Sequence, residues 1–306
     1  MSVSTVKRLF KRKLRSRSVT LEVRADGIAW ASATENNASV SGFAECPPAK
    51  RSSALNQLVH DHGWQGNRAT LILPLDQYGV FQLERPEGLN DVELADALRW
   101  KLKDILDYSP SEAVCDVFPF PSDASRGGDD LVNVVAARKS MASELVKLVM
   151  DSGLVLEKID IAELALRNFA SELDPKGYGI ALVHMRDAYG QMIICKGPVL
   201  YLSRRLDVTA SDLRDASLQE NAVQSLALEI QRSLDYFESQ LGQVPPRAIQ
   251  LVARDAILPL TAMLSAYVAT PINSIDWAAH GLAEPLDSRC LTAWSAGRFG
   301  FAQEAR

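Results

Sequence analysis

Short apolar runs typical of β-strands alternate along this chain with longer stretches in which apolar residues recur every three or four positions. Strands and helices that alternate in sequence pack as layers of helices on sheets, so the pattern predicts an α/β fold. With 306 residues the chain is long enough to form two lobes. The strand-like runs lie at residues 19–23, 69–73, 132–136, 180–184, 192–195 and 249–252.

Four helices are predicted from apolar periodicity and from residues that start or stop helices. The helix at 90–107 begins with Asn90 as N-cap and Glu93 three residues later. The next begins at Ser140 and ends at Gly153, and a third covers 162–173. The longest, at 220–241, ends at a glycine that a proline pair follows. Residues expected to face the core are Leu94, Leu98, Leu102 and Ile105 in the first helix, Met141, Leu145, Leu148 and Val149 in the second, and Val223, Leu226, Ile230, Leu234, Phe237 and Leu241 in the longest.

The composition excludes several classes of protein. Basic residues crowd positions 7–17, before the first acidic residue Glu22, and the remaining chain is acidic, so no folded basic face for nucleic acid is expected. The four cysteines contain no C-x-x-C pair, which favours reduced thiols and a cytosolic location. No uninterrupted apolar run follows the basic start, and none is suited to a membrane span, so neither a secretory signal nor an anchor is predicted.

Four segments occur in an order typical of one family. The segment LALEIQRSLDYFESQLGQVPPRAIQLV at 226–252 resembles the second-lobe helix and strand of PilM, the actin-like cytoplasmic component of type IV pilus assembly. ADALRWKLKDILDYSPSEAVCDVFPFP at 95–121 is more similar to MshI, the PilM-like protein of mannose-sensitive haemagglutinin (MSHA) pili. VNVVAARKSMASELVKLVMDSGLVLEKIDIAELALRN at 132–168 and KGPVLYLSRRLDV at 196–208 complete the resemblance, which covers most of the chain from residue 70 onward.

The resemblance implies an α/β, two-lobed actin-like (FtsA/PilM-like) fold with a small subdomain inserted in the first lobe. PilM-like proteins bind the cytoplasmic N-terminal peptide of a bitopic inner-membrane partner, similar to PilN, in a groove beside that subdomain. Such a peptide recruits a soluble lobe to the membrane. The expected organisation is a basic tail at 1–17, the first lobe at 18–78 and 154–174, the inserted subdomain at 79–153, and the second lobe at 175–306.

Actin-like ATPases hold nucleotide with three glycine-rich loops, because only glycine lets backbone amides approach phosphate closely. Here side chains occupy all three positions: Arg24 in the first, His184 and Arg186 in the turn of the hairpin at 177–206, and Arg254 in the third. Such replacements crowd a nucleotide and remove the carboxylates that organise Mg²⁺. The sequence therefore predicts a pseudo-ATPase with no catalytic residue and no cofactor. The arginines also suit phosphate, so ATP with Mg²⁺ is the disfavoured alternative.

Partner-contact candidates are Trp100, Tyr108 and Phe118, which we expect either to line the peptide groove or to pack in the core. His60 and His62 lack a third ligand nearby, which favours surface histidines over a metal site.

The tail at 1–17 has two interpretations. Val3, Val6, Phe10 and Leu14 would share one side of a helix among cations, as an interfacial helix on anionic lipid requires. A solvated tail fits the charge run equally well.

With the resemblance, the predicted function is a non-catalytic cytoplasmic scaffold of a type IV, MSHA-type pilus assembly platform, peripheral to the bacterial inner membrane. One alternative is an ATP-binding protein whose lobes gate partner affinity. Another is a type II secretion component similar to the cytoplasmic domain of GspL, although GspL proteins continue into a membrane span.

Overall fold

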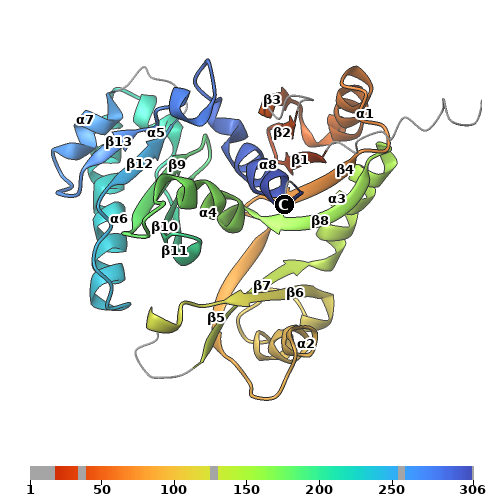
Figure 1. Cartoon of the computed structure of the whole chain (residues 1–306), viewed down its shortest axis with the longest axis horizontal. Coiled ribbons are helices and arrows are strands. Elements are labelled where there is room, and N and C mark those ends of the chain that lie inside the picture. The colour runs from red at the N-terminus through yellow and green to blue at the C-terminus, as the bar shows by residue number, and fades with distance from the viewer. Residues whose placement is uncertain (1–17, 34–38, 125–129, 254–258, 305–306) are drawn as a thin grey trace, which may run out of the picture.

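A computed structural model shows three β-sheets, two in lobes flanked by helices and one in a smaller unit beneath them (Figure 1). The structure describes residues 18–33, 39–124, 130–253 and 259–304. The predicted α/β class and the two lobes are confirmed.

Sheet A forms the first lobe and has the strand order β3-β2-β1-β4-β8. The first three strands are antiparallel neighbours, whereas β1, β4 and β8 run parallel. Helices α1 and α3 cover one face, where Leu55 and Val149 pack on Leu21 and Leu71. The elements are β1 (Ser18–Val23), β2 (Gly27–Ala33), β3 (Ser39–Glu45), α1 (Arg51–Asp61), β4 (Arg68–Leu73), α3 (Lys139–Asp151), β8 (Val155–Ile161) and α4 (Ala162–Leu173).

Sheet C forms the second lobe and repeats this topology, with the order β11-β10-β9-β12-β13. Its first three strands are again antiparallel and its last three parallel. The chain therefore contains a structural duplication that is not visible in the sequence. The elements are β9 (Ile180–Met185), β10 (Gly190–Lys196), β11 (Val199–Leu206), α5 (Ala210–Arg214), α6 (Gln219–Ser239), β12 (Ile249–Val252), α7 (Leu260–Ser265), β13 (Ile272–Ser274) and α8 (Leu291–Glu304).

The lobes meet through α4 and α8, which follow the last strand of each sheet and pack against each other. Phe169 of α4 and Trp294 of α8 are fully buried, and their rings meet edge to face with centroids 5.2 Å apart. Helix α8 lies on β1 and β2, and α4 contacts β9 and β10. This shared core fixes the relative position of the turns that end β1 and β9.

The smaller unit contains sheet B, with the order β5-β7-β6, and α2 packed on it (Figure 1). The prediction placed the inserted subdomain at 79–153, whereas sheet B ends with β7 and α3 packs with sheet A. The subdomain is shorter than predicted because the chain returns to the first lobe directly after β7. The elements are β5 (Tyr78–Glu84), α2 (Asp91–Lys101), β6 (Ala113–Pro119) and β7 (Leu131–Arg138).

The start of α2 confirms the predicted cap, because the Glu93 amide donates to Asn90 Oδ1 at 3.0 Å and the Asn90 amide donates to Glu93 Oε2 at 3.1 Å. Its end is earlier than predicted, at Lys101 instead of 107. Leu98 and Leu102 are buried, but Ile105 is 54% exposed, so its predicted core position is wrong. Tight turns after Lys101 end the helical spacing on which that prediction depended.

The other helix predictions differ from the structure by at most two residues at each end. The stripe of α6 packs in the second-lobe core, and α4 has the predicted bounds. Short antiparallel strands such as β2 and β3 were not predicted, because small and polar residues dominate them.

Candidate functional site

The turns after β1 and β9 meet between the lobes, where nucleotide phosphates lie in an actin-like ATPase. Arg186, which follows β9, places Nη1 2.8 Å from Oε1 of Glu22 on β1. The two side chains are 4% and 0% exposed. Arg186 also donates from Nη2 to Thr292 Oγ1 on α8 at 2.5 Å and from Nη1 to the Tyr189 hydroxyl at 3.3 Å. An ion pair therefore occupies this part of the lobe interface.

Arg186 stays charged because its partner Glu22 is close. Burial by itself lowers the pKa of Arg186, but the carboxylate of Glu22 together with Tyr189 and Tyr78 outweighs burial, and the net shift is upward. Because both charges have left water, removing either partner would leave the other uncompensated.

Arg24 and His184 close the remaining space. Arg24 pairs with Asp26 through Nε and Nη2, at 2.9 and 2.6 Å, and donates from Nη1 to the Arg289 carbonyl at 3.1 Å. His184 bonds the Ser288 carbonyl through Nε2 at 2.7 Å. Burial, reinforced by the charge of Arg186, lowers the pKa of His184 well below its ordinary value, so its ring is neutral and Nε2 carries the proton.

These side chains pack closely together. The crevice lined by Arg24, His184 and Arg186, together with Asp187 and Arg289, has no room for a water molecule. The register of the hairpin does not slip, because Gly190 pairs with Met185 and the Arg186 amide donates to the Tyr189 carbonyl at 2.9 Å. Asp187 instead pairs with Arg214 at 3.2 Å. Arg24, His184 and Arg186 therefore line one crevice, whereas Arg254 lies outside the described residues.

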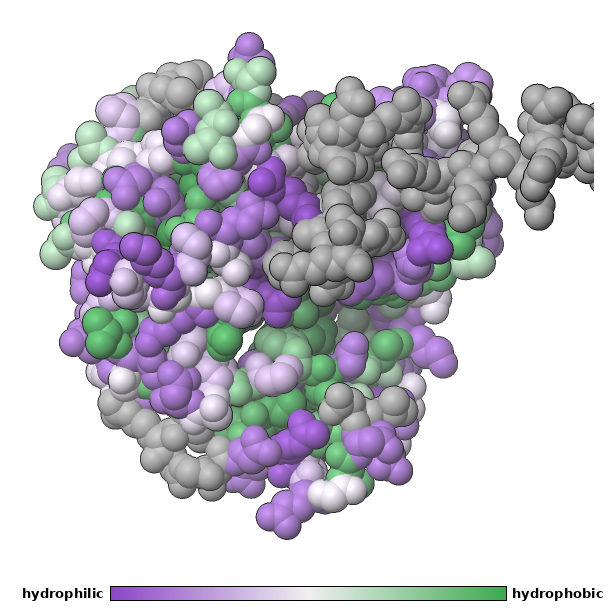
Figure 2. All heavy atoms as spheres, viewed as in Figure 1, coloured by the Kyte–Doolittle hydropathy of each residue, from purple (hydrophilic) through white to green (hydrophobic). Residues whose placement is uncertain are grey.

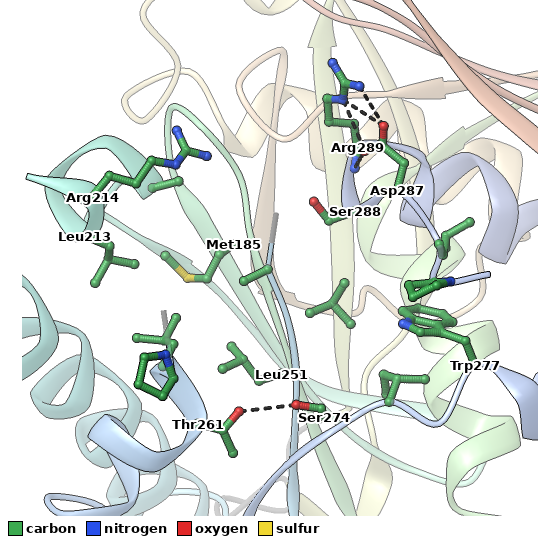
Figure 3. Close-up of a pocket in the computed structure, with 18 of the residues that line it drawn as sticks. Met185, Leu213, Arg214, Leu251, Thr261, Ser274, Trp277, Asp287, Ser288 and Arg289 are labelled. Atoms are coloured by element: carbon green, nitrogen blue, oxygen red, sulfur yellow. Dashed lines mark hydrogen bonds and ion pairs between the residues drawn. The ribbon is translucent and has the colours of Figure 1, made fainter. Parts of the chain in front are cut away.

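A larger cavity of about 1060 Å³ lies next to this crevice, at the ends of β9 and β12 (Figure 3). Apolar side chains such as Leu251 and Trp277 form its walls, and an Asp287–Arg289 pair at 2.6 Å marks its rim. The cavity has room for a small molecule. The predicted third loop, at 253–256, lies outside the described residues except for Ala253.

A second opening lies between the smaller unit and the lobes, with a volume of about 460 Å³. We refer to it as the β5–β11 groove, because those strands supply most of its walls. In Figure 2, apolar residues gather on the smaller unit where it faces the lobes. The lining residues are Leu75, Tyr78, Val80, Phe81, Gln82, Leu83, Ile105, Phe118, Asn133, Glu163, Leu200, Tyr201, Leu202, Ser203 and Arg205.

A buried carboxyl group closes the inner end of the groove. Glu163, at the start of α4, accepts a short hydrogen bond from the Tyr78 hydroxyl and a 3.4 Å bond from Ser203 Oγ on β11. The Tyr78 hydroxyl in turn accepts the Ala162 amide at 3.1 Å. Burial raises the pKa of Glu163. Both lobes and the smaller unit therefore meet at this cluster.

Of the three predicted contact residues, only Phe118 lines the groove. Trp100 is 57% exposed on α2, and Tyr108 stacks under Arg138, with the guanidinium carbon 4.3 Å from the ring centroid. Neither of them is a groove residue. The sequence did not reveal Glu22, Tyr78 or Glu163. The one sequence signal was for Glu163, an acidic residue in the first turn of a helix that also has an apolar face.

His60 is exposed, and His62 stacks against Trp64 with ring centroids 4.4 Å apart. In the described part of the chain, no cluster of three or more metal-ligating side chains occurs. The four cysteines are free. No described helix is long and apolar enough to cross a membrane. The tail at 1–17 lies outside the described residues.

Comparison with solved structures shows which class of protein has this fold. A structure described as the PilM-PilN type IV pilus biogenesis complex aligns with a TM-score of 0.70 and 17% identity over 94% of this chain and 98% of that chain. The cytoplasmic domain of EpsL, an inner-membrane component of the type II secretion system of Vibrio cholerae, aligns at 0.56 and 14%, covering 92% and 94%. A protein of unknown function with an actin-like ATPase fold from Bacteroides thetaiotaomicron aligns at 0.55 and 12%, covering 90% and 95%.

The chain thus has a two-lobed, PilM-like actin-like fold, as its sequence predicted. No protein-family model and no curated protein sequence matches it. At these identities the structural likeness defines the fold, and the function must be argued from the site.

Proposed function

We propose that this protein is a non-catalytic scaffold on the cytoplasmic side of a type IV pilus assembly platform, of the MSHA type. In this proposal the β5–β11 groove binds the cytoplasmic N-terminal peptide of a bitopic, PilN-like inner-membrane partner. The observation that carries the proposal is a contrast between two sites of one actin-like fold. Side chains including Arg186, the ion-pair partner of Glu22, fill the phosphate crevice, whereas the groove is open and has both apolar and polar walls.

A filled crevice argues against nucleotide hydrolysis. Glu22 and Asp26 face arginines, so neither carboxylate is free to organise Mg²⁺ in this arrangement. In contrast, the groove offers apolar side chains that a short peptide can cover, and polar side chains that can bind its backbone or side chains. A docking role agrees with two of the similar solved structures, one described as a PilM-PilN complex and the other as a component of a type II secretion system.

The test is capture of synthetic peptides that represent the cytoplasmic N-termini of single-span membrane proteins encoded beside this chain. We expect one of them to bind the full chain and to lose about tenfold or more of its affinity when Ile105→Arg puts a charge into the groove. Ile105 is already exposed, so this variant should fold. Val114→Arg, at an exposed position of β6 that does not line the groove, is the matched control. Equal binding by both variants would contradict the proposal.

The large cavity favours a second candidate, a nucleotide-binding protein whose lobes gate partner affinity. The cavity volume is sufficient for an adenine-sized ligand. The phosphates of a bound nucleotide, however, would have no room in the filled crevice. Nucleotide affinity separates the two candidates. The likeness to EpsL keeps a type II secretion component as a further alternative, and the identity of the captured membrane peptide decides between the two systems.

A further inference from the structure

One wall of the groove is an unpaired strand edge. In the order β5-β7-β6, strand β5 pairs on one side only, and the described residues place no other strand beside it. Its pairing with β7 runs from Tyr78 to Glu84 without a register shift. The strand, YGVFQLE, contains neither proline nor lysine, two residues that commonly protect an edge from further pairing. It therefore presents a regular, unprotected edge of seven residues.

The hydrogen-bond pattern shows which backbone groups face outward. Just beyond β5, the Arg85 amide donates to the Asp130 carbonyl at 2.7 Å, which defines a hydrogen-bonded pair. Such pairs alternate with pairs whose N–H and C=O groups point away from the partner strand. In the regular register of β5, Val80 and Gln82 therefore direct their N–H and C=O groups away from β7. Both residues line the groove.

The opposite wall is less suited to pairing. Strand β11 is also an edge, but its register with β10 shifts between Ile194 and Cys195, which produces a bulge near Tyr201. Bulges interrupt an edge and discourage a further strand. Leu200 and Leu202 on this wall are mostly buried in the cores of the lobes. Strand β11 therefore supplies a wall of side chains, among them Tyr201, Ser203 and Arg205, whereas β5 supplies hydrogen bonds.

We propose that the partner's peptide binds as an added strand on β5 and extends sheet B to the order peptide-β5-β7-β6. This inference rests on the proposed function and specifies its binding mode. An added strand lies about 4.8 Å from its neighbour and alternates its side chains between two faces. Only an extended chain can satisfy the outward groups of both Val80 and Gln82 while covering the apolar side chains of the groove. The expected segment is extended, apolar at alternate positions, and free of proline where it pairs.

The first test compares Gln82→Pro with Gln82→Ala, using the peptide captured as described above and the full chain. Proline removes the outward amide of Gln82 and leaves the ladder to β7 intact, whereas alanine keeps that amide. Both variants remove the Gln82 side chain, which lines the groove, so the comparison isolates the amide. We expect Gln82→Pro to weaken binding about tenfold more than Gln82→Ala does. Circular dichroism and thermal melting check that both variants fold.

The second test leaves the protein unchanged. Single N-methyl groups placed along the peptide should weaken binding at every second residue, because alternate amides of an added strand face β5. Hydrogen exchange should show the Val80 and Gln82 amides exchanging fast in the free protein and slowly in the complex. The Phe81 and Leu83 amides, which bond β7, should be protected in both.

The outcomes separate the two proposals. If no membrane peptide binds, the proposed function and the strand mode both fail. If a peptide binds and Ile105→Arg blocks it, but Gln82→Pro, N-methylation and amide exchange show no alternation, only the strand mode fails.

Discussion

Arg186 of the second lobe and Glu22 of the first lobe lie 2.8 Å apart in a dry interface between the lobes. Each comes from the end of a strand that leads to a phosphate loop in an actin-like ATPase. The pair is one of the buried polar contacts between the lobes.

Glu22→Gln should destabilise the fold by about 3–5 kcal/mol, because it leaves the buried guanidinium without a counter-charge. The double variant Glu22→Leu with Arg186→Met removes both charges and should cost less than Glu22→Gln alone. Urea unfolding measures each free energy. Glu157→Gln breaks the exposed pair with Arg68 and serves as control, with an expected change under about 1 kcal/mol. Equal effects of Glu22→Gln and Glu157→Gln would show that burial of the pair has no energetic consequence.

ATP or ADP, with or without Mg²⁺, should bind the pure protein no more tightly than about 1 mM, because side chains fill the phosphate crevice. Isothermal titration calorimetry measures this affinity. Micromolar binding would overturn the pseudo-ATPase proposal and favour the nucleotide-gated alternative.

Stability should fall as the pH drops below about 6.5, the ordinary pKa of histidine. The pKa of His184 is lowered in the folded state, so in this window the unfolded chain binds a proton that the folded chain does not. This group contributes a slope of up to about 1.4 kcal/mol per pH unit, with stability greatest above pH 6.5.

His184→Gln should reduce that slope, measured by urea unfolding between pH 7 and 5, whereas His60→Gln, at an exposed position, should not. Burial also lowers the pKa of His280, so part of the slope should persist in His184→Gln. An unchanged slope in His184→Gln would show that the ring can be charged in the folded protein.

Tyr78→Phe should cost about 1–3 kcal/mol, because the buried carboxyl of Glu163 loses its hydroxyl partner. Tyr178→Phe is the matched control, since Tyr178 is half exposed and contacts Arg247 through its ring. Thermal and urea unfolding report the difference. If the two variants are equally stable, Glu163 does not need the hydroxyl to remain buried.

The apolar periodicity of α4 and α6 predicted those helices almost to their ends, and the Asn90–Glu93 spacing predicted a cap that the structure confirms. Local patterns of this kind are enough to predict a helix or a cap, because each depends on residues only three or four positions apart. Ile105 shows where such a prediction fails. The helix ends at Lys101 and the chain turns, so Ile105 does not lie on the apolar face to which its spacing assigned it.

The sequence by itself determined the α/β class, the main helices and the presence of side chains where glycines would be needed to hold phosphate. Only the tertiary structure decided that Glu22 faces Arg186, that sheets A and C repeat one topology, and that β5 leaves an edge open opposite β11. The reason is distance along the chain. Glu22 and Arg186 lie in different lobes, and β5 and β11 lie in the smaller unit and the second lobe, so these residues come together only in the folded chain.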